Sequence, residues 1–176
     1  MPMTTANKLT IARVLMIPVF LVILYWGFPG SSYVALAVYI IACLTDLADG
    51  YIARHYNQVS DFGKFMDPLA DKCLVMAALC WFVENGDMVG WVLAAVLLRE
   101  FAVSGMRLVA VEQGRVIAAA WSGKVKTAST MVCLCLMLVF ESNLLNVVCI
   151  AVIVATTVYS GIEYFAKNLD VFKEAD

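Results

Sequence analysis

The segment that decides the fold spans residues 46–71 and reads DLADGYIARHYNQVSDFGKFMDPLAD. A long apolar stretch precedes it and another follows it. At about 100° per residue, Asp46 and Asp49 share one helical face, as do Asp67 and Asp71. The segment therefore predicts the end of one helix and the start of the next, with two carboxylate-bearing faces that meet.

The sequence as a whole is too apolar for a soluble protein. Hydrophobic residues make up 63% of the 176 residues and charged residues 15%, whereas soluble domains are about half apolar and a quarter charged. A bilayer-spanning helix needs about 20 residues, so roughly six helices account for the chain. The near-neutral balance, 12 Lys and Arg against 14 Asp and Glu, argues against a nucleic-acid partner.

Polar turns divide the apolar sequence into six segments. One turn is the WGFPGSS sequence at 26–32, and others lie at residues 84–87 and 141–143. Another is marked by Gln113 and Gly114 with the polar residues up to Lys126. The predicted helices cover residues 9–25, 33–55, 65–84, 88–111, 121–140 and 144–166. The predicted fold is a single all-α membrane domain over residues 1–176, with six transmembrane helices and a short polar tail at 167–176.

The distribution of basic residues predicts the orientation, because Lys and Arg stay on the cytoplasmic side. With the N-terminus inside, the outer turns contain no Lys or Arg and hold the acids Glu84, Asp87 and Glu141. The inner segments hold the basic residues Lys8, Arg13, Arg54, Lys64, Arg115, Lys124, Lys126, Lys167 and Lys173. Both termini and the acidic segment are therefore expected on the cytoplasmic side.

The four aspartates of the deciding segment need a cationic partner. Asp46 lies nine residues before the predicted helix end at His55, or about 13 Å at helical rise, where an unpaired carboxylate is costly in a membrane. Carboxylate oxygens are the ligands that Mg²⁺ and Mn²⁺ prefer, especially when substrate phosphates complete the shell. Helix capping or pairing with nearby Arg and Lys would explain one such acid more easily than four. The sequence therefore predicts a divalent-metal site.

The same residues spell D-x-x-D-G-x-x-A-R, eight further residues, and G-x-x-x-D-x-x-x-D. This pattern resembles the signature of the CDP-alcohol phosphotransferase family. Every defined position matches: Asp46, Asp49, Gly50, Ala53, Arg54, Gly63, Asp67 and Asp71. The resemblance implies a membrane enzyme that transfers a phosphatidyl group from CDP-diacylglycerol to an alcohol and releases CMP. It also implies a homodimer among lipids of the bacterial cytoplasmic membrane, with the active site facing the cytoplasm.

The resemblance also implies roles for individual residues. Asp46, Asp49 and Asp67 would bind a two-metal centre of Mg²⁺ or Mn²⁺, while Asp71 would be the general base and also contact metal. The expected CDP-diacylglycerol-binding residues are Asn7, Thr10, Arg13, Asp49, Gly50, Ala53, Arg54, Gly63 and Lys64. The first three form an N-x-x-T-x-x-R stretch like the one with which many members begin. An interfacial helix start with cytoplasmic charge is the alternative for that stretch.

Basic residues in the second half indicate an acceptor alcohol that carries a phosphate. The order LREF, SGxR and WSGKVKT resembles the bacterial phosphatidylglycerophosphate synthases of this family, whose acceptor is sn-glycerol 3-phosphate. Arg99 lies about halfway along its predicted span and is expected to pair with Glu100 or with an aspartate of the motif. The expected acceptor-binding residues are Arg107, Lys124, Lys126 and Thr127, with Arg99 as a further candidate.

Several alternatives stay open from the sequence alone. The acceptor could be that of a phosphatidylinositol-phosphate or cardiolipin synthase, and Lys124 and Lys126 could only anchor a helix at anionic headgroups. A cation transporter would place its acids near mid-membrane, often between repeated halves. Here the acids gather on one side and no repeat is visible, so an enzyme is favoured. A non-catalytic subunit would leave four costly acids unexplained.

Overall fold

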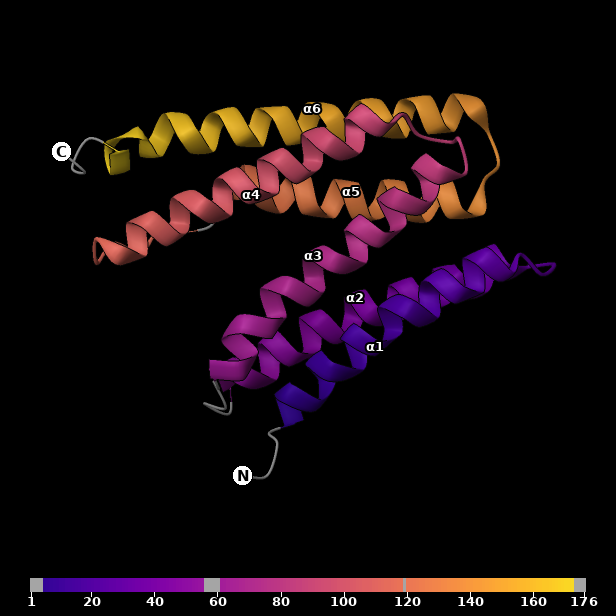
Figure 1. Ribbon diagram of the computed structural model, residues 1–176, viewed down its shortest axis with the longest axis horizontal. Coiled ribbons are helices and arrows are strands. Elements are labelled where there is room, and N and C mark those ends of the chain that lie inside the picture. The colour runs from indigo at the N-terminus through magenta and orange to yellow at the C-terminus, as the bar shows by residue number, and fades with distance from the viewer. Residues whose placement is uncertain (1–4, 56–60, 119, 173–176) are drawn as a thin grey trace. The chain divides into compact units, whose positions relative to one another are not determined.

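The computed structural model describes the backbone of residues 5–55, 61–118 and 120–172. Over these ranges the chain folds into six α-helices and one short 3₁₀ helix, without a strand (Figure 1). The elements are α1 (Thr5–Trp26), α2 (Ser31–His55), α3 (Asp61–Glu84), α4 (Gly90–Glu112), α5 (Trp121–Val139), α6 (Asn143–Asn168) and η1 (Leu169–Phe172). The predicted all-α fold is confirmed, and each helix lies where the apolar segments predict one.

The chain divides into two compact units. The first contains residues 1–82, with α1, α2 and nearly all of α3, and the second contains residues 83–176, with α4, α5, α6 and η1. The single domain expected over residues 1–176 stays a prediction.

In the first unit, α1 and α2 pack along one another (Figure 1). The ring centroids of Phe20 in α1 and Tyr39 in α2 lie 5.8 Å apart, and both side chains are buried. Small residues next to Tyr39, Ala35 and Ala42, are also fully buried and let the helices approach closely. The tight turn between the helices contains Gly27 and Gly30 at φ 62° and 86°, a conformation that glycine adopts without strain.

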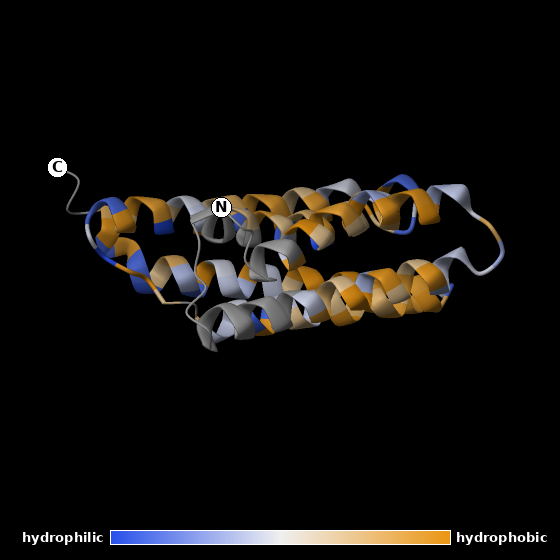
Figure 2. Ribbon diagram, turned by 90° about the horizontal axis from the view of Figure 1, so that it is seen from below, coloured by the Kyte–Doolittle hydropathy of each residue, from blue (hydrophilic) through white to orange (hydrophobic). Residues whose placement is uncertain are grey.

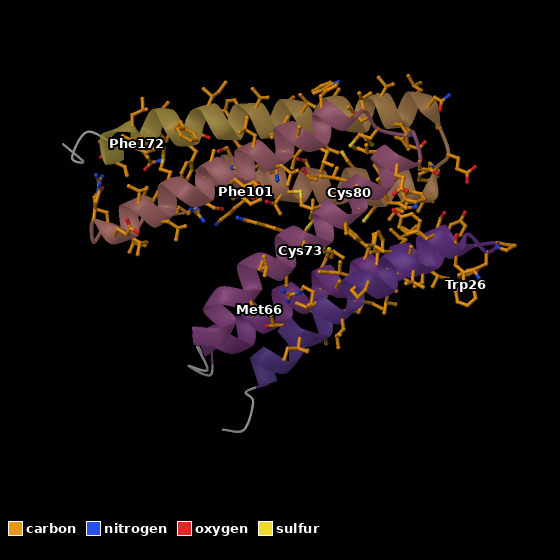
Figure 3. The ribbon with its side chains drawn as sticks, viewed as in Figure 1. Trp26, Met66, Cys73, Cys80, Phe101 and Phe172 are labelled. Carbon is orange, nitrogen blue, oxygen red and sulfur yellow. The ribbon has the colours of Figure 1, made fainter. Side chains whose placement is uncertain are left out.

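Helix α3 buries one face along its second half. Ala70, Leu74, Ala78 and Phe82 recur at spacings of four residues and are almost fully buried. Met66, Cys73 and Cys80 lie along the same helix and mark its course in Figure 3.

In the second unit, α6 packs against both α4 and α5. Its buried residues recur at spacings of three or four: Asn146, Cys149, Ile153, Thr157, Ser160 and Tyr164. Helix α4 ends at Glu112, and Gly114, two residues later, has φ 73°. The Arg115 amide donates to the Ala110 carbonyl at 2.8 Å and the Gly114 amide donates to the Val111 carbonyl at 2.9 Å, a Schellman motif. This cap starts the loop that leads to α5.

Within the described residues, three helical segments are long and apolar enough to cross a membrane: Leu9–Trp26, Trp121–Val139 and Asn143–Phe172. Large apolar side chains also face outward on helices of both units, as Trp26 does at the end of α1 (Figure 3). Figure 2 shows hydrophobic residues over most of the helical length and hydrophilic residues near the C-terminal end. Because water disfavours so much exposed apolar surface, the chain is a membrane protein.

Candidate active site

The first half of the acidic motif continues a face of α2 whose earlier residues are buried. Ser31, Ala35, Tyr39 and Ala42 are buried at spacings of four, four and three residues. Positions 46, 49 and 53 continue this series at spacings of four, three and four, and the helix continues through His55. The side chains of residues 46–65 lie outside the described part of the structure. The backbone register therefore sets Asp46, Asp49 and Ala53 on one face of α2.

The second half of the motif has the same relation to α3. The helix begins at Asp61, four residues earlier than expected, so Gly63 and Lys64 belong to its first turn. Positions 63, 67 and 71 precede the buried Leu74 and Ala78 in a series with spacings of three or four residues. The side chains of Asp67 and Asp71 lie outside the described residues. Five residues join α2 to α3, so a short connection links the two halves of the motif.

Two of the residues predicted to bind the nucleotide lipid are buried in the first unit. Thr10 and Arg13 are each only 1% exposed and lie on the face of α1 that also buries Phe20 and Leu24. A guanidinium group is rarely buried this completely without anionic or hydrogen-bonding partners, because its desolvation is costly. Arg13 is therefore not a surface cation of the kind that only orients a helix at the membrane face. Asn7 lies three residues before Thr10 in α1, and its side chain is outside the described residues.

The four motif aspartates have the chemistry of a divalent-metal site. Each of the two helices supplies two carboxylates, at spacings of three residues in α2 and four in α3. Carboxylates are hard oxygen donors, and Mg²⁺ is held in proteins by a few of them together with substrate phosphates. Among the side chains that the structure describes, no group of three or more His, Cys, Asp or Glu could hold a metal ion. The chemistry of the four carboxylates, as hard oxygen donors, fits Mg²⁺ or Mn²⁺.

In the second unit, Glu100 binds two basic residues through one carboxylate oxygen. Its Oε1 accepts hydrogen bonds from Arg99 Nη1 at 2.9 Å and from Lys126 Nζ at 2.8 Å. The side chains of Arg99, Glu100 and Lys126 are 12%, 13% and 5% exposed. The expected pairing of Arg99 with Glu100 is present. These three residues, called the Glu100 cluster below, join α4 to α5.

Two glycines make room for the long side chain of Arg99. A Cβ atom on Gly123 of α5 would lie 3.4 Å from Arg99 Nη2, and one on Gly161 of α6 would lie 3.3 Å from Arg99 Cγ. Arg99 therefore lies against both neighbouring helices at positions without a side chain. Two residues of the WSGKVKT sequence therefore contact the Glu100 cluster. Gly123 leaves space for Arg99, and Lys126 binds the Glu100 carboxylate.

The other predicted acceptor-binding residues have different surroundings. The Arg107 side chain is exposed, and its Nε donates to the hydroxyl of the buried Tyr164 at 3.0 Å. Lys124 is exposed, and the Thr127 hydroxyl donates to the Gly123 carbonyl at 3.1 Å. The structure thus brings Arg99 and Lys126 together in the interior, while Arg107 and Lys124 have exposed side chains. Tyr164 was not predicted, since nothing in the sequence links it to Arg107, 57 residues away.

The C-terminal end of this unit closes over the loop that follows α4. Gln113 Nε2 donates to the Val171 carbonyl at 3.0 Å, and Arg115 Nη2 lies 2.5 Å from Asp170 Oδ2. Val171 is fully buried, so the segment expected as a polar tail contributes to the fold.

A cavity of about 420 Å³ lies beside these contacts. Its lining includes Arg115, Trp121, Glu163, Tyr164 and Lys167, and Lys167 forms an ion pair with Glu163.

Comparison with known proteins gives the family. Residues 3–159 match the CDP-alcohol phosphatidyltransferase family. The chain belongs to this family. The membership indicated by residues 46–71 is thereby confirmed, and the match extends far beyond the motif into α6.

Relatives in the CDP-alcohol phosphatidyltransferase family are similar over most of the chain. A Bacillus subtilis protein named CDP-diacylglycerol--glycerol-3-phosphate 3-phosphatidyltransferase is 39% identical, with 97% of each chain covered. A Mycobacterium tuberculosis protein named probable phosphatidylglycerophosphate synthase is also 39% identical, over 93% of this chain and 81% of the relative. An Escherichia coli protein with the same name as the Bacillus relative is 38% identical, over 72% of this chain and 71% of the relative.

Proposed function

We propose that the chain is an integral membrane phosphatidyltransferase that converts CDP-diacylglycerol and sn-glycerol 3-phosphate into phosphatidylglycerol phosphate and CMP. The observation that carries this proposal is the 39% identity, over 97% of both chains, to the Bacillus subtilis protein that bears this activity in its name. The buried Thr10 and Arg13 and the basic residues of α4 and α5 support it, because both substrates are anionic.

The motif residues supply the donor side of the reaction. Asp46, Asp49 and Asp67 hold Mg²⁺ or Mn²⁺ at a two-metal centre, and Asp71 contributes a further carboxylate. When bound, these ions offset negative charge on the pyrophosphate of CDP-diacylglycerol. The residues that bind the nucleotide lipid are Asn7, Thr10, Arg13, Asp49, Gly50, Ala53, Arg54, Gly63 and Lys64.

The chemical step is a direct displacement with Asp71 as the base. Asp71 takes the proton of the acceptor hydroxyl, and the hydroxyl oxygen forms a bond to the lipid-side phosphorus. The bond from that phosphorus to the bridging oxygen breaks, and CMP leaves with the electron pair. No covalent aspartyl intermediate is formed.

Basic residues of the second unit bind the phosphate of sn-glycerol 3-phosphate. Guanidinium and ammonium groups form strong charge-assisted hydrogen bonds to phosphate oxygens. The proposed acceptor-binding residues are Arg107, Lys124, Lys126 and Thr127, with Arg99 as a further contributor.

The membrane arrangement follows from the charges. All six helices span the bilayer of a bacterial inner membrane, and both termini and the active site face the cytoplasm, where the loop-borne Lys and Arg lie. Helices α2, α3 and α4 carry charged residues because they bear the site. The enzyme acts as a homodimer among its membrane lipids.

Release of CMP by the purified protein tests the proposed acceptor. The protein in detergent receives CDP-diacylglycerol, Mg²⁺ or Mn²⁺, and one of four acceptors: glycerol 3-phosphate, inositol 1-phosphate, serine or phosphatidylglycerol. Of the four acceptors, we expect only glycerol 3-phosphate to give rapid CMP release. Faster release with inositol 1-phosphate or phosphatidylglycerol would instead assign the acceptor of another branch of the family.

Replacing Lys124 by Gln should weaken acceptor binding selectively. The KM for glycerol 3-phosphate is expected to rise roughly tenfold, because a hydrogen bond to a charged group worth about 1.5 kcal/mol is lost. The KM for CDP-diacylglycerol should stay within about twofold of the wild-type value. Lys167→Gln is the matched control, since Lys167 is exposed and paired with Glu163. Equal shifts of both KM values would show that Lys124 does not bind the acceptor.

A further inference from the structure

The Glu100 cluster contains two cations and one carboxylate, all with low exposure. Arg99 and Lys126 both donate to one oxygen of Glu100, so the three formal charges sum to +1. The three side chains are at most 13% exposed. Arg99 Nε is buried and has no hydrogen-bond partner within the described part of the chain. An enclosed excess charge is costly unless an anion is present for at least part of the time.

Both cations keep donors beyond those that Glu100 uses. The Lys126 ammonium has three N–H donors and gives one to Glu100, and the Arg99 guanidinium has five and gives one through Nη1. Their positions are fixed, because the shared carboxylate oxygen ties α4 to α5 and the glycines at 123 and 161 accommodate Arg99. Fixed donors and an excess positive charge are what a phosphate site requires.

The cluster is poorly explained by stability alone. Apolar residues of similar volume often stabilise a protein as well as a buried ion pair does. Glycines within α5 and α6 also weaken those helices relative to alanine. A structural role would be filled more simply by a packed apolar contact.

We infer that Glu100 is a positioning residue for the acceptor. Its carboxylate orients Arg99 and Lys126 toward the phosphate of glycerol 3-phosphate. This inference rests on the proposed function and deepens it. It separates the basic residues into two kinds: Arg99 and Lys126 are oriented by Glu100, whereas Arg107 and Lys124 are exposed and are not joined to this carboxylate.

Three variants test the role of Glu100 in the purified protein. In Glu100→Gln the KM for glycerol 3-phosphate should rise at least about tenfold, while the KM for CDP-diacylglycerol stays within about twofold. Glu100→Asp keeps the carboxylate and should recover at least about half of that loss on a logarithmic scale. The double variant Glu100→Gln with Lys126→Met keeps the summed charge at +1 without a buried ion pair, so it should fold even if Glu100→Gln does not.

The double variant tests charge balance through folding and the contribution of Lys126 through the acceptor KM. We expect its thermal unfolding temperature in detergent to match the wild type, while its KM for glycerol 3-phosphate stays raised at least about tenfold because Lys126 is missing. Asp170→Asn, which removes the carboxylate of the exposed pair with Arg115, is the matched control and should leave both KM values unchanged.

Three results would overturn the inference: equal shifts of both KM values in Glu100→Gln, a wild-type acceptor KM in the double variant, or loss of folding in all three variants. The last result would assign Glu100 a purely structural role. If the wild-type protein itself releases no CMP with glycerol 3-phosphate, the proposed function has failed instead, so the two failures are distinguishable.

Discussion

Replacing Asp71 by Asn is expected to lower kcat by about 10³-fold while the protein remains folded. The position of Asp71 on α3 continues the helical face that carries Asp67 and, further along, the buried Leu74. An amide of the same shape cannot take the proton of the acceptor hydroxyl, and general-base catalysis contributes about 10² to 10⁴ in rate. The measurement is steady-state CMP release from CDP-diacylglycerol and glycerol 3-phosphate.

Two controls give the Asp71→Asn result its meaning. Asp170→Asn makes the same chemical change at an exposed position in η1 and should keep wild-type kcat. Binding of Mn²⁺, measured by electron paramagnetic resonance, should persist in Asp71→Asn because three aspartates remain. A kcat near the wild-type value would remove Asp71 as the base, and loss of metal binding would make it primarily a ligand.

Removal of divalent metal is the second change with a large expected effect. Dialysis against a chelator should reduce CMP release at least about 100-fold, because bound cations contribute several kcal/mol of charge stabilisation in such reactions. Addition of Mg²⁺ or Mn²⁺ should restore it. Ca²⁺ should restore little, since it prefers more ligands at longer distances than the smaller ions.

The metal experiment also distinguishes a metal site from a structural role of the four aspartates. The conservative variants Asp46→Asn and Asp67→Asn should raise the Mg²⁺ concentration needed for half-maximal rate. Full activity in the metal-free protein would show that the aspartates have a structural role, with capping or pairing to Arg54 and Lys64 as the explanation. It would leave the family assignment intact, because that assignment rests on similarity across residues 3–159.

The helices could be predicted from the sequence because their ends are locally encoded. Gly27 and Gly30 end the first apolar stretch with positive φ angles, and Gly114 caps α4. The acidic motif could be found for a similar reason. Its residues recur at helical spacings within 26 consecutive positions, so one short stretch of sequence contains the whole pattern.

The orientation of the basic residues in α5 could not be predicted. Lys124 and Lys126 are two positions apart, which places them on different sides of a helix. The buried face of α5 includes Ser122, Lys126 and Thr130, and nothing in their polarity marks this face as internal. Only the tertiary contact with Glu100, 26 residues away, explains why Lys126 is enclosed and Lys124 is exposed.

The contact between Arg107 and Tyr164 shows the same limit over a longer separation. Arg107 follows Glu100 by two turns of α4, but its hydrogen-bond partner comes from the far end of α6. Such pairs depend on how helices pack, and packing directions are set by many weak apolar contacts that no local pattern records.

The identity of the lipid product tests the central claim most directly. Purified protein in detergent would receive CDP-diacylglycerol of defined acyl chains, Mg²⁺ and carbon-13-labelled glycerol 3-phosphate, and the extracted lipids would be measured by mass spectrometry. We predict one new lipid with the mass of phosphatidylglycerol phosphate, which carries the label and forms in equal amount with CMP. CMP released without a labelled lipid, or a lipid formed only when another acceptor is supplied, would contradict the proposal.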